Sequence, residues 1–193
     1  MKLFLVSKSP RRAEILSKFG YRFEVVEPIN EDRMSLKKFD PVEVLRVARA
    51  KLSGIEEQGV LLAADTVVVI DNQLLPKPSS LNEARKFLKK LSNRVHRVYT
   101  GYVLRKLPGG RESGKTECTE VKFKDLSDAE IEWLIKMDNP LDKAGGYAIQ
   151  GVAGLFIEWI KGDYYNVIGL PISSVYKSLK DFGVLPQGLK VGK

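Results

Sequence analysis

The stretch that decides the fold is VLLAADTVVVI, residues 60–70. A continuous apolar run of this length, rich in β-branched residues, is typical of a strand buried on both faces of a sheet. One acid, Asp65, interrupts the run, and an ionised carboxylate is costly there unless a positive or polar group faces it. Two interpretations stay open. A local hydrogen bond or an arginine holds Asp65, or Asp65 is a general base or a carboxylate near a metal, since desolvation raises a carboxyl pKa.

Predicted strands and helices alternate on both sides of this run. Helix starts are predicted at Ser9-Pro10 and Asp40-Pro41, and the sequences SLNE (80–83) and SDAE (127–130) fit capping boxes. Short strands are predicted at 2–6, 21–26, 74–75 and 154–160, a long antiparallel pair at 95–104 and 116–123, and a last helix across 175–182. This order predicts an α/β (mixed α+β) fold, in which helices flank a mixed sheet.

Length and composition predict one compact domain over residues 1–185, with a loose C-terminal tail at 186–193. No run approaches the roughly 18 apolar residues that a membrane span needs, and the first apolar segment is too short for a signal peptide. The only cysteine, Cys118, cannot form an intramolecular disulfide, which agrees with a reducing compartment. We therefore expect a cytoplasmic location and no membrane partner.

The formal charge of +8 predicts attraction to polyanions such as nucleic acid, nucleotides or phosphorylated metabolites. Many of the lysines belong to predicted solvated helix faces and the C-terminal end. The chain also lacks aromatic RNA-binding patterns and zinc-finger spacing. Charge alone therefore does not make nucleic acid the expected partner.

The segment SKSPRR, residues 7–12, follows a predicted strand and opens a predicted helix. Free backbone N–H groups and the helix dipole favour an anion at such a place. Arg11 and Arg12 could bind phosphate oxygens through paired hydrogen bonds. By itself, the segment is more typical of a capped surface helix with solvated arginines, and it matches neither a Walker A loop nor a Rossmann glycine pattern.

Further charged residues are candidates for polyphosphate or metal contacts. Lys51 and Lys77 could bind phosphates, although each alone is typical of a solvent-exposed lysine. Glu31 and Asp32 lie in a polar segment and could supply oxygen ligands for Mg²⁺, although acids in a surface loop are the commoner case.

Two more candidates are neutral. Gln150 lies in the glycine-rich segment 141–151, and its amide both donates and accepts, which suits a nucleobase edge as well as an ordinary loop. His96 is the only histidine, and no nucleophile elbow accompanies it. We interpret His96 as structural or peripheral.

Taken together, these segments resemble the Maf family of nucleoside triphosphate pyrophosphatases. The resemblance extends from Lys2 to about Gly183, and the order and spacing of its blocks are specific. The blocks are SKSPRR (7–12), ADT (64–66), KP (77–78), LS (91–92) with His96 and TG (100–101), DKAG (142–145), IQG (149–151) and GDYY (162–165) with VIGLP (167–171).

The resemblance implies a two-lobed, ITPase-like α/β fold with an elongated mixed sheet and a cleft between the lobes, often in homodimers. It also implies hydrolysis between the α- and β-phosphates of a nucleoside triphosphate, with a divalent cation such as Mg²⁺, Mn²⁺ or Co²⁺. Arg11, Thr66 and Gln150 are similar to the branch that acts on dTTP and UTP. Lys8 and Pro76 stand where small residues are usual in the family.

The resemblance and the residues together predict a role for each candidate. Asp65 is the catalytic residue, either as general base or through a metal-bound water, and Glu31 is a metal ligand. Thr66 and Gln150 read the pyrimidine. The triphosphate is held by Ser7, Arg11, Arg12, Lys51 and Lys77.

Two alternatives belong to other functions. The positive charge and the family's association with septum formation are also consistent with a protein that binds nucleic acid or regulates cell division. The other alternative is clearance of modified nucleotides, with dTTP and UTP as secondary substrates.

Overall fold

The computed structural model describes residues 1–29 and 39–190, which form two compact units. Unit 1 comprises residues 1–65, 100–117 and 169–193, and unit 2 comprises residues 66–99 and 118–168. Three long strands, β3 (Gly59–Ile70), β5 (Val95–Leu107) and β6 (Glu112–Phe123), contribute residues to both units. The predicted limits of a domain at 1–185 and a tail at 186–193 stay a prediction.

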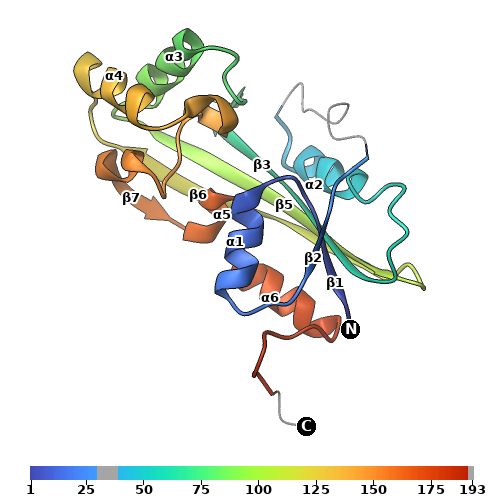
Figure 1. The fold of residues 1–193 in the computed structure, drawn as a ribbon. Helices are drawn as coiled ribbons and strands as arrows, with labels where there is room; N and C mark the ends of the chain where they lie inside the picture. Colours follow the sequence, from blue (N-terminus) through green and yellow to red (C-terminus); the bar gives the residue numbers. More distant parts are fainter. Residues whose placement is uncertain (30–38, 191–193) are drawn as a thin grey trace. The chain divides into compact units, whose positions relative to one another are not determined.

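The strands form one seven-stranded mixed sheet, which confirms the predicted fold class (Figure 1). Hydrogen-bonded neighbours follow the order β2-β1-β3-β5-β6-β7, and β4 pairs with β3. The first strand is parallel to β2 and β3, whereas the β3–β4 and β6–β7 pairs are antiparallel. The remaining strands are β1 (Leu3–Val6), β2 (Glu24–Val26), β4 (Gln73–Leu75) and β7 (Ile157–Lys161).

Six α-helices are described. In unit 1 these are α1 (Pro10–Lys18), α2 (Pro41–Ala50) and α6 (Ile172–Asp181), and in unit 2 they are α3 (Leu81–Leu91), α4 (Asp128–Met137) and α5 (Tyr164–Ile168). Three short 3-10 turns also belong to unit 2: η2 (Pro140–Asp142), η3 (Ala144–Gly146) and η4 (Val152–Phe156). Within the described residues, no helix has both the length and the apolar character that crossing a membrane requires.

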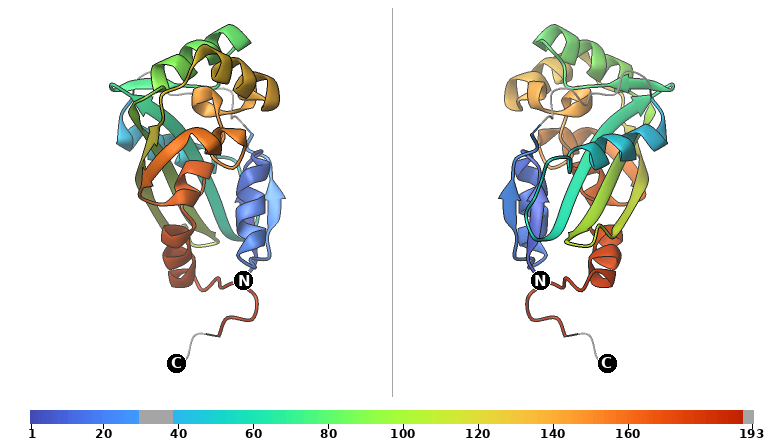
Figure 2. Two further views of the ribbon diagram at one scale, coloured as in Figure 1. Left: turned by 90° about the vertical axis from the view of Figure 1, so that its left-hand side faces the viewer. Right: turned by 90° about the vertical axis from the view of Figure 1, so that its right-hand side faces the viewer.

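Each unit has its own apolar core. In unit 1, side chains of β1, β3 and β5 pack with side chains from α2 and the segment after it, including Phe4, Ala48, Leu52 and Leu61. In unit 2, α3 and α4 lie side by side (Figure 2), and side chains from both helices pack with β5 and β6, including Leu88, Phe123 and Ile131. Burial of these side chains is what holds the functional segments described below in place.

The predicted helix starts are correct in position but differ in their hydrogen bonds. Ser127 and Glu130 form the complete capping box that the sequence predicts. At α3, Ser80 accepts from the Glu83 N–H, but the Glu83 carboxylate accepts from Ser79 instead of the Ser80 N–H. The predicted reciprocal box at Ser80 is therefore wrong in one of its two bonds.

Strand β3 is less uniformly buried than its composition suggests. Ten of the eleven residues quoted first are apolar or uncharged, yet residues 65–67 are only half-buried, while the flanking residues 59–64 and 68–70 are buried. After the strand, Asp71 and Asn72 take left-handed conformations with φ of 52° and 58°, which forms the predicted turn into β4. The prediction of burial on both faces is thus wrong at Asp65 and at the two residues that follow it, Thr66 and Val67.

Candidate active site

Asp65 forms an ion pair with a lysine, which offsets the cost of a carboxylate in an apolar run. The Lys51 Nζ lies 2.9 Å from Asp65 Oδ1, and the same ammonium donates to the Ala64 carbonyl at 3.1 Å. The Lys51 side chain is only 4% exposed, whereas that of Asp65 is 22% exposed. The sequence predicted Lys51 as a phosphate contact, but did not identify it as the cation that holds Asp65.

In this ion pair the lysine is buried and the aspartate is half-buried. Lys51 follows the last residue of α2, and Leu52 beside it is buried in the core of unit 1. A buried ammonium is tolerated when a charge and a carbonyl satisfy it, which Asp65 and Ala64 do. The arrangement fixes one carboxylate oxygen of Asp65 at the point where β3 becomes half-buried.

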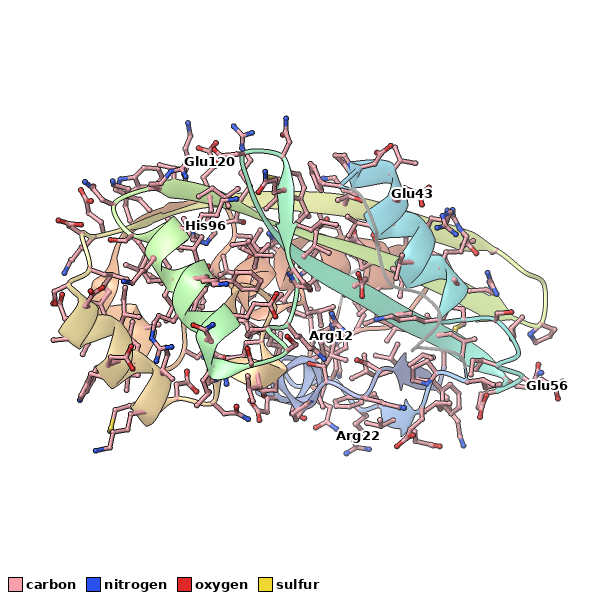
Figure 3. The ribbon with its side chains drawn as sticks, turned by 90° about the horizontal axis from the view of Figure 1, so that it is seen from above. Arg12, Arg22, Glu43, Glu56, His96 and Glu120 are labelled. Atoms are coloured by element: carbon pink, nitrogen blue, oxygen red, sulfur yellow. The ribbon has the colours of Figure 1, made fainter. Side chains whose placement is uncertain are left out.

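A second cluster lies at the turn from β1 into α1. Ser7 Oγ accepts from the Ser9 N–H at 3.1 Å and from Arg12 Nη1 at 3.1 Å. Arg12 Nε donates to the Gly169 carbonyl at 2.9 Å, and Arg12 is only 7% exposed. Arg12 stands at the beginning of α1, in its first turn (Figure 3). The Ser9 side chain makes no capping bond to the helix, so the predicted Ser9 cap is wrong in this respect.

The two clusters belong to neighbouring parallel strands. In the β1–β3 ladder, Val6 pairs with Ala63, so that Ser7 and Asp65 lie just beyond the last paired residues. The carboxyl ends of parallel strands and the helix starts that follow them are common sites for anionic ligands. Ser7, Arg12, Lys51 and Asp65 are therefore gathered at one end of the β1–β3 pair. Arg11, which is half-buried, is the second residue of α1.

In unit 2, the predicted residues lie on segments that contact one another. Thr66 is half-buried on β3, and Lys77 and Gln150 are exposed. The Gly145 N–H donates to the Pro76 carbonyl at 3.1 Å, next to Lys77. Gly145 has a φ of +72°, and a Cβ there would lie 3.0 Å from the Val68 side chain. The glycine-rich loop thus packs between β3 and the segment that carries Lys77, in a conformation that favours glycine.

Only part of the predicted metal site lies within the residues that the structure describes. Glu31 and Asp32 lie outside the residues that the structure describes. Within residues 1–29 and 39–190, no group of three or more His, Cys, Asp or Glu side chains is arranged to hold a metal ion. Asp65 supplies one carboxylate, and Mg²⁺ is often bound by one or two carboxylates together with substrate phosphates. The donor set therefore fits a cation held jointly with a polyphosphate.

Two contributors were not assigned a role from the sequence. The Gly169 carbonyl binds Arg12 across a separation of 157 residues, which no local pattern reveals. Lys143 is 8% exposed and pairs with Asp138 at 3.0 Å and Asp142 at 2.7 Å. The adjacent Asp-Lys in DKAG was a usable signal for this second pair, but the contact with Asp138 depends on the loop conformation.

These features define an α/β protein with a buried arginine at the turn after β1 and an ion-paired carboxylate just beyond the last paired residues of the parallel β1–β3 ladder. The chain belongs to the Maf family: residues 2–182 match the family described as Maf-like protein.

Curated relatives match nearly the whole chain. A protein of Carboxydothermus hydrogenoformans is 44% identical over 188 residues, covering 95% of this chain and 100% of the relative. One of Thermococcus gammatolerans is 47% identical, covering 94% and 96%, and one of Syntrophus aciditrophicus is 42% identical, covering 95% and 91%. All three are named dTTP/UTP pyrophosphatase. The solved Ham1 protein of Staphylococcus aureus is a distant likeness, with a TM-score of 0.42 and 11% identity over 65% of this chain and 73% of that one.

Proposed function

We propose that this protein hydrolyses dTTP and UTP to the nucleoside monophosphate and pyrophosphate. The observation that carries the proposal is the Lys51–Asp65 pair, with its 2.9 Å contact, next to the β1–α1 turn that holds Arg11 and Arg12. Relatives that bear this activity in their names share 42–47% of their residues with this chain and have nearly the same length. Hydrolysis of a phosphoanhydride uses a base that activates water and cations that stabilise the charge on the phosphate oxygens. A carboxylate beside cations can supply both.

Asp65 would act as the general base. A water oxygen attacks the α-phosphorus, its proton passes to the Asp65 carboxylate, and the bond from the α-phosphorus to the bridging oxygen breaks to release pyrophosphate. Lys51 already engages Oδ1, so we assign Oδ2 as the atom that accepts the proton. Once the carboxylate is neutralised, the nearby ammonium has a charge to offer to the developing negative charge on the phosphate oxygens.

Arg11 and Arg12 would have different roles. Arg12 is buried and bonded to Ser7 and Gly169, so its first task is to fix the turn at the start of α1. Arg11 is less buried and stands in the first turn of α1, where the helix dipole favours an anion. Lys77 is exposed and would bind the far end of the polyphosphate. Ser7 contributes by shaping the turn.

A divalent cation, Mg²⁺, Mn²⁺ or Co²⁺, would be held by the substrate phosphates, with Glu31 as the proposed protein ligand. When bound, such a cation neutralises charge on the phosphate oxygens. Thr66 and Gln150 would read the pyrimidine, because a hydroxyl and an amide can each donate and accept hydrogen bonds. A homodimer and a cytoplasmic location complete the proposal.

The test is a panel of nucleoside triphosphates incubated with the purified protein and each of the three cations. We expect dTTP and UTP to have the highest kcat/KM, with pyrophosphate as the product. Release of orthophosphate would contradict the bond assignment. A strong purine preference would contradict the pyrimidine assignment, and a preference for modified nucleotides would favour their clearance as the main role.

The nucleic-acid alternative is tested with Arg11→Ala. An enzyme of the proposed kind should lose most of its triphosphate turnover, because Arg11 is assigned to the polyphosphate. A protein that attracts nucleic acid through its +8 charge should lose little binding from one arginine, and its binding should depend steeply on salt.

A further inference from the structure

His96 and Tyr147 form a buried hydrogen-bonded pair in unit 2. His96, labelled in Figure 3, lies on β5 and is 1% exposed, and its Nε2 is 2.5 Å from the Tyr147 hydroxyl oxygen. The Tyr147 ring also meets the Phe123 ring edge-on, with centroids 5.0 Å apart. His96 Nδ1 is buried and has no hydrogen-bond partner within the described residues. Among the described residues, the Tyr147 hydroxyl is thus the hydrogen-bond partner of the imidazole.

The pair is neutral at ordinary pH. Burial lowers the pKa of His96 to about 3, and burial raises the pKa of Tyr147 above its usual range. A neutral pair with no exposed face is unsuited to proton transfer with a substrate, but it can fix the position of the backbone that carries it.

That backbone continues directly into the turn that presents Gln150. The Gly151 N–H donates to the Ala148 carbonyl at 3.0 Å, which closes a four-residue turn with Gln150 at its third position. Tyr147 immediately precedes this turn, so the buried ring anchors its beginning. Gln150 itself is exposed.

The end of the turn is anchored as well. A Cβ on Gly151 would lie 2.6 Å from Asp138 Oδ2, so the backbone at Gly151 packs closely against this carboxylate. Asp138 is held in turn by Lys143, whose Nζ is 3.0 Å from Oδ1. Gln150 therefore projects from a short turn with the buried Tyr147 ring at its beginning and the half-buried Asp138 carboxylate at its end.

We propose that His96 and Tyr147 are positioning residues that set pyrimidine selectivity by fixing the Ala148–Gly151 turn, an inference that rests on the proposed function of Gln150. An amide side chain can donate to the O4 carbonyl of thymine or uracil, and it can equally accept from the amino group of cytosine. Amide chemistry alone does not separate these bases. The position of the amide relative to the ring has to do so, which requires a fixed backbone.

The first experiment compares Tyr147→Phe with wild type by amide hydrogen exchange and by kinetics on dTTP and dCTP. Without the hydroxyl, both imidazole nitrogens lack a partner, and we expect faster exchange of the Gly151 amide. We also expect the ratio of kcat/KM for dTTP over dCTP to fall by about 2- to 10-fold, the worth of one hydrogen bond, with most of the change in KM. Tyr102→Phe is the matched control. It removes a buried hydroxyl that bonds Ser174 and Ser178 in unit 1, and both readouts should match wild type.

A double variant separates positioning from stability. His96→Leu with Tyr147→Phe replaces both polar partners, so stability should recover relative to either single change, while selectivity stays low. Recovery of selectivity together with stability would overturn the proposal, as would an unchanged dTTP/dCTP ratio in Tyr147→Phe. Unchanged Gly151 exchange would overturn the anchoring step regardless of catalysis. If wild type hydrolyses no pyrimidine triphosphate while Gly151 exchange responds as expected, the failure lies in the proposed function, and the selectivity role falls with it.

Discussion

Two polar pairs of the described residues differ both in charge and in burial. Lys51 and Asp65 in unit 1 are an ion pair with a partly exposed carboxylate, whereas His96 and Tyr147 in unit 2 are a neutral pair sealed from solvent. An ion pair that reaches a half-exposed strand can exchange a proton and attract phosphate. A sealed neutral pair can only hold its surroundings. The comparison teaches that burial of a polar group indicates function only when one of its atoms can reach a ligand.

The largest effect should come from removing the charge of Asp65. We expect Asp65→Asn to lower kcat for dTTP by about 10²- to 10⁴-fold, the usual contribution of a general base. Asp71→Asn is the control, because Asp71 follows the same strand and also pairs with a base, Arg94, at 2.6 Å. Pyrophosphate release measures the turnover. A wild-type rate in Asp65→Asn would contradict the assignment of proton transfer to the Lys51–Asp65 pair.

The next effect concerns the stability that Lys51 provides. Lys51→Met leaves the Asp65 carboxylate without its partner, and we expect the free energy of unfolding to fall by about 1–3 kcal/mol. This is less than for a fully buried pair, because Asp65 is 22% exposed. Urea unfolding measures the change. An unaltered midpoint and slope would show that the pair adds nothing to stability.

The neutral pair predicts a pH effect on stability. The unfolded chain protonates His96 below its ordinary pKa of about 6.5, whereas the folded protein does so only near a pKa of about 3. The stabilising contribution is therefore complete above about pH 6.5 and is lost as the pH falls toward 3, with a slope of up to about 1.4 kcal/mol per pH unit. The double variant His96→Leu with Tyr147→Phe should lack this component. Equal acid sensitivity in both proteins would contradict the assigned burial of the imidazole.

The last prediction concerns the loop that carries Gln150. Gly145→Ala should destabilise by about 1–2 kcal/mol because of its left-handed conformation, and by a further amount from contact with Val68 at 3.0 Å. Gly110→Ala is matched, since its φ of +67° is similar but nothing lies within 4 Å of the added Cβ. Thermal unfolding of both variants measures the difference. Equal losses of stability in the two variants would mean that contact between the added Cβ and Val68 of β3 costs nothing.

The sequence predicts the mixed sheet and its flanking helices because long apolar runs and helix starts are local signals. Ser127 and Glu130 form their predicted box, since both partners lie within one turn. The Arg12–Gly169 bond joins residues 157 positions apart, and the Asp138–Lys143 contact depends on the conformation of the loop between them, so that local patterns reveal neither. The short helix α5 was missed because five residues carry too little periodicity.

The same limit explains the candidate site. The apolar setting of Asp65 predicts that a partner is needed, but not which of the many cations supplies it. Lys51 is 14 residues away and reaches Asp65 only because α2 packs beside β3. Similarly, the sequence predicts that His96 is structural or peripheral, whereas its contact with Tyr147 across 51 residues required the fold.

The most direct test of the central claim is hydrolysis of dTTP in water enriched in heavy oxygen, followed by mass analysis of both products. Attack on the α-phosphorus with Asp65 as base predicts one heavy oxygen in the dTMP and none in the pyrophosphate. Asp65→Asn should slow this incorporation without moving the label. Label in the pyrophosphate, or release of dTDP and orthophosphate, would contradict the account.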